Sequence, residues 1–261
     1  MMNNIFRLTA APILIVSAAV ILAACGGGGG GSSSADDQGV NTSGGTWQLV
    51  KEEWDLDNNG TIDDVTAYTY DAAGNRIKAE CDDGNNGTID CVTTYSYDAN
   101  GRQIREARDE DNNGSIDWAA AYIYDADGRR AKEEWDQFNN GTIEEVTVFT
   151  YDVAGNRIKA EWDNGDNGTI DWIATYTYDS NGYQTGEAWD EGNNGTLDWV
   201  AAYSYAGGKL TRADWDQFDN GTIDWVITYN YDPNGNLIKV EIDRDNNGIV
   251  DGVVYNTWAQ I

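Results

Sequence analysis

The chain repeats one acidic, glycine-containing stretch eight times, and this repeat limits what it can fold into. The first copy reads Asp55-Leu56-Asp57-Asn58-Asn59-Gly60-Thr61-Ile62-Asp63. Its central glycine recurs at steps of 27 residues, with one step of 26, at Gly87, Gly114, Gly141, Gly168, Gly195, Gly221 and Gly248. A short fixed period indicates an array of equivalent supersecondary units, each of which packs against its neighbours.

Between the acidic loops, the sequence alternates with a period of two. In the unit 156–182, one side of the first run carries Ile158, Ala160 and Trp162. The other side carries Arg157, Lys159 and Glu161. The second run, 170–178, alternates in the same way and places Ile170, Trp172, Ala174, Tyr176 and Tyr178 on one side. Period-two alternation of aromatic and β-branched residues predicts β-strands with one aromatic face.

The connections between these runs contain Gly with Asn or Asp, which is the chemistry of tight turns. Such short connections predict antiparallel neighbours, so we expect an all-β meander of about eight hairpins over residues 46–261. Open twisted sheets seldom exceed about 10 strands. The sheet should therefore roll with its aromatic face inward, as a closed barrel, a spiral barrel or a two-layer sheet. One turn, at Ala206-Gly207-Gly208, is a residue shorter, and we expect it to leave the strand register unchanged.

The second turn of each unit carries a recognisable motif, Tyr-x-Tyr-Asp-x-x-Gly. It stands at Tyr68 to Gly74, Tyr95 to Gly101, Tyr122 to Gly128, Tyr176 to Gly182 and Tyr229 to Gly235, with a near match at Phe149 to Gly155 and a departure at Ala206. These turns resemble YD (Rhs-type) repeats, a resemblance that covers residues 47–258. It implies β-hairpins wound into a shell. The acidic loop is a departure from that family, and we do not expect its toxin-delivery function here, so only the hairpin geometry is carried over.

The acidic loops place oxygen ligands at alternate positions, with a glycine at the sixth position for the sharp turn. Ca²⁺ takes six to eight hard oxygens, which alternate residues of a tight loop can direct to one centre. Three loops hold carboxylates at positions 1, 3 and 9 and Asn at position 5: Asp55, Asp57, Asn59 and Asp63; Asp109, Asp111, Asn113 and Asp117; Asp243, Asp245, Asn247 and Asp251. The backbone carbonyls at position 7 would belong to Thr61, Ser115 and Ile249.

The other five loops lack the acid at position 3, where Gly84, Phe138, Gly165, Gly192 and Phe218 stand. We expect calcium in the three complete loops and leave the other five open. The alternative is that Asn-Gly only makes turns, with solvated aspartates beside it. Position 12 of the first loop is Thr66 rather than Glu, which argues against an EF-hand. The loops resemble instead the shorter calcium loops of thrombospondin type 3 and integrin-type repeats.

Cys81 and Cys91 flank the second acidic loop. In other units the same two slots hold pairs of tryptophans, such as Trp162 with Trp172. Two residues that change together within one unit suggest contact across the hairpin, and in an exported protein this predicts a disulfide. Two free buried thiols are the alternative.

The first residues have the pattern of an export signal. Arg7 is the one charge in residues 1–24, and an apolar run ends in Leu22-Ala23-Ala24-Cys25. This ending resembles a bacterial lipobox, which implies cleavage before Cys25 and lipidation of its thiol. A Gly/Ser-rich tether then covers residues 25–45. Because Gly26 rather than Asp follows Cys25, we expect an outer-membrane or cell-surface location.

The composition narrows the functional classes. A net charge of −29 argues against a nucleic-acid partner. The chain has no histidine, and its eight similar units do not single out a catalytic site, so we do not expect an enzyme. The preferred hypothesis is a calcium-stabilised surface lipoprotein with a structural or protein-interaction role. The alternative is a carbohydrate-binding surface lipoprotein that uses exposed aromatic side chains.

Overall fold

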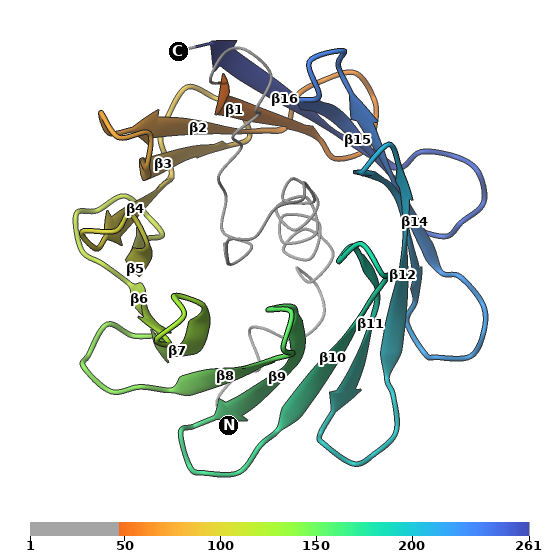
Figure 1. Cartoon of the computed structure of the whole chain (residues 1–261). Helices are drawn as coiled ribbons and strands as arrows, with labels where there is room; N and C mark the ends of the chain where they lie inside the picture. The colour runs from red at the N-terminus through yellow and green to blue at the C-terminus, as the bar shows by residue number, and fades with distance from the viewer. Residues whose placement is uncertain (1–46, 261) are drawn as a thin grey trace, which may run out of the picture.

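The computed structural model describes residues 47–260, which form 16 antiparallel strands closed into a barrel (Figure 1). Consecutive strands pair as hairpins, as the period-two pattern predicts. The strands are β1 (Trp47–Asp55), β2 (Asp64–Tyr70), β3 (Arg76–Asp83), β4 (Cys91–Tyr97), β5 (Gln103–Asp109), β6 (Trp118–Tyr124), β7 (Arg130–Asp136), β8 (Glu145–Tyr151), β9 (Arg157–Asn164), β10 (Trp172–Tyr178), β11 (Gln184–Glu191), β12 (Trp199–Ala206), β13 (Lys209–Asp216), β14 (Trp225–Tyr231), β15 (Leu237–Asp243) and β16 (Gly252–Gln260). Within this part of the chain, no helix is long and apolar enough to cross a membrane.

The barrel closes where the first and last strands meet. β1 pairs with β16 from Trp47 opposite Gln260 to Asp55 opposite Val253. Closure leaves neither strand with an unpaired edge, which removes the site at which an open sheet would aggregate. Of the three rolled forms that the sequence allows, the structure is the closed barrel.

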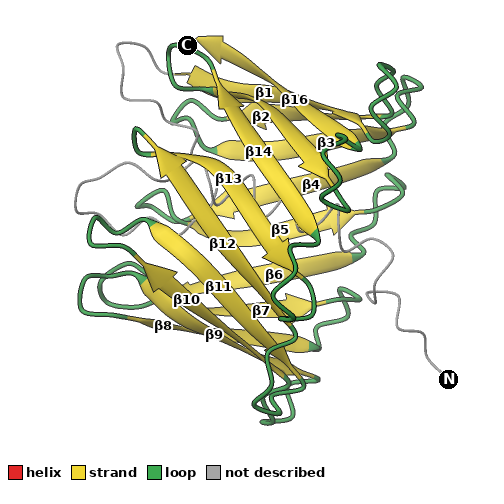
Figure 2. Cartoon of the chain, turned by 90° about the vertical axis from the view of Figure 1, so that its right-hand side faces the viewer, coloured by secondary structure: helices red, strands yellow, loops and turns green. Residues whose placement is uncertain are grey.

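The two ends of the barrel carry different connections, and Figure 2 shows them at opposite ends of the tilted strands. At one end, which we call the acidic rim, the nine-residue acidic loops join each odd-numbered strand to the next. At the other, the turn rim, the YD-type turns join each even-numbered strand to the next. In these turns the aspartate side chain accepts backbone N–H groups, as Asp71 does from Ala73 and Asn75.

The shortened turn keeps its register for a simple reason. Gly207 and Gly208 both have positive φ, at 59° and 77°, and Ala206 pairs with Lys209. Two central residues with positive φ make the two-residue hairpin turn whose twist matches that of the strands. The missing residue therefore changes the turn type and leaves the pairing of β12 with β13 intact.

A β-bulge follows each turn and corrects the predicted alternation. Thr150 pairs with Lys159, but Tyr151 pairs with Arg157, so Ile158 is passed over. The prediction that Ile158 faces inward and Arg157 outward is wrong. Arg157 instead lies on the inner face, with its guanidinium 4.6 Å from the Tyr176 ring, and Ile158 is 38 % exposed. A bulge adds one residue to one strand and thereby reverses the faces beyond it.

The inner wall of the barrel is largely aromatic. Four indole rings form one continuous row: Trp162 and Trp189 lie 4.6 Å apart, Trp189 and Trp199 4.7 Å, and Trp199 and Trp215 5.1 Å. The second tyrosine of the YD motif has a fixed partner, because Tyr97 donates its hydroxyl to the Arg76 carbonyl at 2.6 Å. The second tyrosines of four other motifs donate in the same way to a backbone carbonyl 21 residues earlier: Tyr70, Tyr124, Tyr151 and Tyr178.

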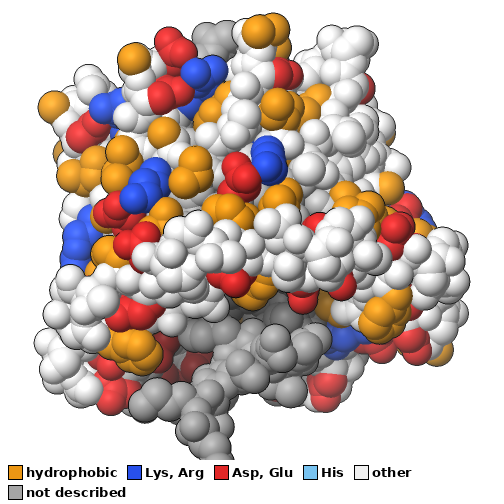
Figure 3. Space-filling view, turned by 90° about the horizontal axis from the view of Figure 1, so that it is seen from below, with side chains coloured by type: hydrophobic (Ala, Val, Ile, Leu, Met, Phe, Trp, Pro, Cys, Tyr) orange, Lys and Arg blue, Asp and Glu red, His pale blue; other side chains and the backbone are white. Residues whose placement is uncertain are grey.

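The outer wall carries charge in place of aromatics. Six of the odd-numbered strands hold a cation and an acid two residues apart that form an ion pair, as Lys159 and Glu161 do at 2.6 Å. Figure 3 shows such basic and acidic side chains beside one another among small apolar ones. β11 departs from this pattern, because Gly186 and Ala188 occupy the two positions, and the wall is hollowed there between Thr175, Thr177 and Gly186.

Candidate metal loops at the acidic rim

All eight acidic loops share one hydrogen-bond pattern at position 1. In the first loop, Asp55 accepts the backbone N–H of Asn59 at 2.9 Å and that of Gly60 at 2.8 Å, one on each carboxylate oxygen. Across the eight loops, the distance from the glycine nitrogen to the position-1 carboxylate is 2.6 to 2.8 Å. Gly60 has φ +87°, which only glycine adopts without strain.

The acid at position 9 closes the loop from its other end. Asp63 accepts the N–H of Leu56 at 2.8 Å, and its counterparts do the same at 2.6 to 2.8 Å in the other seven loops. Acids at positions 1 and 9 therefore satisfy loop N–H groups in every copy, complete or not. These hydrogen bonds explain why both acids are present in all eight loops, because unsatisfied backbone donors are costly.

Position 3 is different, because the loop forms without an acid there. Five loops close with Gly or Phe at this position. Gly84, Gly165 and Gly192 have positive φ there, whereas Phe138 and Phe218 do not, as in the complete loops. In the three complete loops the carboxylates at positions 1, 3 and 9 offer oxygens within 4.8 Å of one another: Asp55, Asp57 and Asp63; Asp109, Asp111 and Asp117; Asp243, Asp245 and Asp251. In each set, the position-1 or position-9 acids are more covered than the exposed acid at position 3. Hard oxygens gathered in this way fit a divalent cation such as Ca²⁺.

The loops are also linked to one another. The residue at position 4 has positive φ in all eight loops, and in six of them it is an asparagine that donates its side-chain N–H to the position-8 carbonyl of the preceding loop. We call these bonds clasps. Asn85, for example, donates to the Ile62 carbonyl at 3.2 Å. Asp166 and Asp219 occupy position 4 of the fifth and seventh loops and lack this donor. The sequence offers this signal as an Asn-Asn-Gly run, but its partner is seen only in the structure.

Two of the three complete loops stand on either side of the closing seam. The first loop follows β1, the eighth precedes β16, and the third joins β5 to β6. At the seam Asn58 donates to the Val250 carbonyl at 3.1 Å, and Arg244 donates to the Leu56 carbonyl at 3.3 Å. Negative charge is dense along this rim: burial, with Asp64 and Asp90 nearby, raises the pKa of Asp83.

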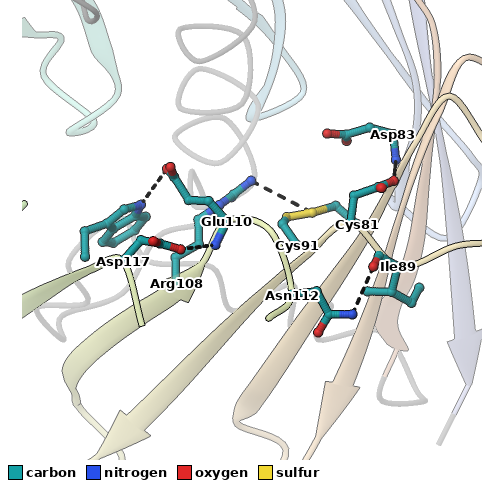
Figure 4. Close-up of a disulfide and its surroundings, with 10 residues drawn as sticks. Cys81, Asp83, Ile89, Cys91, Arg108, Glu110, Asn112 and Asp117 are labelled. Carbon is teal, nitrogen blue, oxygen red and sulfur yellow. Dashed lines mark hydrogen bonds between the residues drawn. A yellow bond between two sulfur atoms is a disulfide. The ribbon is translucent and has the colours of Figure 1, made fainter. Parts of the chain in front are cut away.

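The predicted disulfide is present. Cys81 and Cys91 are bonded and lie directly opposite each other on β3 and β4, with Cα atoms 5.1 Å apart (Figure 4). Both are buried, and the Arg108 guanidinium donates to the sulfur of Cys81 at 3.8 Å. The predicted lipidation site, Cys25, and the tether lie outside the described residues.

Sequence reasoning missed a polar cluster on the inner wall. Glu106 accepts the hydroxyl of Tyr122 at 2.8 Å, and Arg130 forms an ion pair with Glu133 at 2.8 Å. Burial raises the pKa of Glu106. The signal was a glutamate in four units at a position where the other four have alanine or valine, and it is visible only once the bulge has fixed which face is inner.

These features define a class: a closed antiparallel β-barrel of hairpin repeats whose acidic rim carries three sets of convergent carboxylates. No protein-family profile matches the chain. No curated protein matches its sequence.

Several solved structures are similar to this chain. A porin-like protein from Bacteroides uniformis ATCC 8492 has a TM-score of 0.52 and 11% identity, covering 81% of this chain and 96% of its own. One from Bacteroides vulgatus ATCC 8482 has a TM-score of 0.41 and 11% identity, covering 80% of this chain and 97% of its own. A TcdB2-TccC3-Cdc42 structure has a TM-score of 0.34 and 16% identity over 72% of this chain, which spans 12% of the matched chain. At 11% identity, the likeness to the Bacteroides uniformis protein concerns the barrel fold alone.

Proposed function

We propose that this chain is a calcium-stabilised β-barrel of the bacterial surface, tethered through a lipid on Cys25, with a structural or protein-interaction role and no catalysis. One observation carries the proposal. Asp57, Asp111 and Asp245 add a third carboxylate to loops that fold without one elsewhere in the same barrel. A residue that the local fold does not require, placed where it completes a cation site, supports a ligand role.

The charge balance of the complete loops favours a bound cation. Two carboxylates about 4 Å apart repel by roughly 1 kcal/mol in water and by more near protein. Each complete loop places three carboxylates within such reach, at 4.8 Å or less. A divalent ion converts this repulsion into attraction. Exposed loops of this kind bind calcium weakly, at about 10⁻⁴ to 10⁻³ M, which suits an extracellular site.

The charge on the outer wall favours a barrel whose outer face contacts water rather than lipid. Transmembrane barrels present an apolar band to lipid, and a Lys or Arg at the bilayer midplane costs about 2–4 kcal/mol. Here cation–acid pairs such as Lys78 with Glu80 and Lys239 with Glu241 lie in the middle of the outer face. A barrel held at the surface by a lipidated tether accommodates this wall, whereas lipid contact does not.

The test is calcium binding to the full-length lipoprotein. Calorimetric titration should give three equivalents, and excess chelator should lower the melting temperature. Asp57→Asn should remove one equivalent. Glu191→Gln, which removes one charge from an exposed position of the sixth loop, should leave the stoichiometry unchanged. The proposal is rejected if neither calcium nor chelator changes the melting temperature and the titration gives no heat of binding.

One specific observation favours the carbohydrate-binding hypothesis. Most aromatic side chains line the inner wall, but Phe138 and Phe218 are 68% and 70% exposed at position 3 of the fourth and seventh loops. They are the aromatics that the acidic rim offers to a glycan. Binding to a glycan array that is lost in Phe138→Ala/Phe218→Ala, with the fold intact, would favour this second role.

A further inference from the structure

The chain contains two structurally distinct groups of Asn-Gly pairs, the dipeptide most prone to spontaneous deamidation. Three lie in the turn rim, at Asn100, Asn181 and Asn234. Eight lie at positions 5 and 6 of the acidic loops, at Asn59, Asn86, Asn113, Asn140, Asn167, Asn194, Asn220 and Asn247. A further pair, Asn164-Gly165, stands at positions 2 and 3 of the fifth loop. Gly165 donates to a neutral acceptor, the backbone carbonyl of Glu144, so this pair lacks the carboxylate contact of the eight loop pairs.

The reaction depends on the glycine N–H. The backbone nitrogen of glycine attacks Cγ of the asparagine, the new N–Cγ bond forms, and the Cγ–Nδ2 bond breaks. Ammonia leaves with the proton that the glycine nitrogen gives up. Water then opens the succinimide to an aspartyl or an isoaspartyl residue. Because the nitrogen must lose its proton before it attacks, the group that accepts this N–H controls the rate.

In the acidic loops the acceptor is a carboxylate. Gly141 donates to Asp136 at 2.7 Å, and the corresponding distances are 2.6 to 2.8 Å in all eight loops. A charge-assisted hydrogen bond of this length stabilises the protonated amide. Removing the proton would leave two anions in contact, which is unfavourable near protein. The nucleophile is therefore held in its unreactive form.

The loop pairs also have a contact that favours the reaction. The side-chain oxygen of Asn140 accepts the N–H of Thr142 at 2.8 Å, and its counterparts accept the same N–H at 2.7 to 2.9 Å. A donor on this oxygen polarises the side-chain carbonyl and makes its carbon a better electrophile. The position-1 carboxylate therefore opposes the attack of the glycine nitrogen on a side-chain carbon that this hydrogen bond makes more reactive.

In the turn rim the acceptor is neutral. Gly101 donates to the backbone carbonyl of Asp98 at 3.0 Å, Gly182 to that of Asp179 at 3.1 Å and Gly235 to that of Asp232 at 3.0 Å. The carboxylates of these aspartates accept other N–H groups, as Asp98 does from Asn100 and Arg102. Loss of the glycine proton here does not place two anions in one hydrogen bond.

We propose that Asn100, Asn181 and Asn234, together with Asn164, are the sites at which the folded protein deamidates, and that the position-1 aspartates protect the eight loop pairs. Modification of the folded barrel then adds charge at the turn rim and at Asn164, and spares the Asn-Gly pairs at positions 5 and 6 of the acidic loops.

The wild-type chain provides the first test. The folded, full-length protein is incubated near neutral pH, and digests taken over time are analysed by mass spectrometry for the mass increase and for isoaspartyl products. The turn pairs should react at least tenfold faster than the loop pairs, a difference of about 1.4 kcal/mol in activation free energy. In chaotrope the two groups should converge. Equal rates in the folded protein would overturn the proposal.

A matched pair of variants isolates the carboxylate. Asp136→Asn replaces the oxygen that faces Gly141 with an amide, in a loop that lacks the third acid and so stays outside the calcium proposal. Glu144→Gln removes the other acid of that loop, which accepts the N–H of Gln137 at 2.8 Å. Deamidation of Asn140 should accelerate in Asp136→Asn alone, while Asn194 in the same molecule reports that the rest of the rim is folded. No acceleration in Asp136→Asn, or the same acceleration in both variants, would show that the carboxylate does not protect.

Discussion

The side-chain amide of Asn58 donates to the backbone carbonyl of Val250, 192 residues further along the chain, at 3.1 Å. This bond is one of the six clasps, and it spans the seam between β1 and β16. Clasps link the seventh, eighth, first, second, third and fourth loops without a break. All three complete loops therefore lie in one continuous arc of the rim, which Asp166 and Asp219 bound on either side.

Asn58→Gly should weaken the seam. Glycine adopts the positive φ of this position and adds no charge, so the substitution removes little besides the clasp. A net loss of about 1 kcal/mol in the free energy of unfolding is expected for one hydrogen bond. Denaturant unfolding measures the loss, and hydrogen exchange should show faster opening of β1 and β16.

The control for this variant is Asn193→Gly, which removes the clasp to Ile170 away from the seam. It should cost a similar free energy but leave exchange in β1 and β16 unchanged. Faster exchange of the seam strands in both variants would show that the clasps do not act locally.

Asp166→Asn should stabilise the barrel. Position 4 of the fifth loop has φ +46°, which asparagine tolerates as well as aspartate does, and the new amide would face the Ile143 carbonyl of the fourth loop. The expected gain is about 0.5–1.5 kcal/mol, the net contribution of one hydrogen bond. Asp166→Gly removes the same charge without supplying a donor. If it stabilises as much as Asp166→Asn, relief of charge repulsion is the cause rather than a new clasp.

The strands and their pairing could be predicted from the sequence because a period of two leaves few alternatives. The faces could be predicted only in part. Alternation placed Ala160 and Trp162 inward correctly, but the bulge at Ile158 brought Arg157 inside. A bulge is a property of how a turn joins two strands, and counting residues within one strand does not reveal it.

The acidic loops show a second limit of the sequence. The carboxylates at positions 1 and 9 recur in every copy and left open whether the five incomplete loops bind a metal. Their hydrogen bonds to loop N–H groups explain why Asp136 and Glu144 are present in a loop with no third acid. Closure between Trp47 and Gln260 was likewise beyond prediction, because these residues have no local relationship. Pairing of distant strands depends on the size and tilt of the whole barrel.

Loss of the disulfide should destabilise the barrel. Cys81 and Cys91 are 10 residues apart in the chain, and a cross-link that closes so short a loop contributes about 2–3 kcal/mol. Reduction of the wild type and the Cys81→Ala/Cys91→Ala variant should both lower the denaturant midpoint. Because alanine also leaves a cavity in the buried wall, the variant should lose more than the reduced protein. Unfolding that does not respond to reductant would contradict the prediction.

The inner carboxylate Glu145 should make stability depend on pH. Burial, with Glu133 nearby, raises the pKa of Glu145 from 4.5 to about 6. A carboxyl whose pKa is higher in the folded state favours folding below its ordinary pKa, and this contribution is lost as pH rises through about 6. Above that pH the ionised group opposes folding by up to about 2 kcal/mol, because one pKa unit corresponds to about 1.36 kcal/mol.

Glu145→Gln should therefore stabilise the barrel at pH above 6 and have little effect at pH below 4.5. Glu144→Gln, one residue away at position 9 of the fourth loop, removes a neighbouring charge and serves as the matched control. Denaturant midpoints measured across this pH range for the three proteins decide the matter, and a gain from Glu145→Gln that does not vary with pH would show that its charge is not the cause.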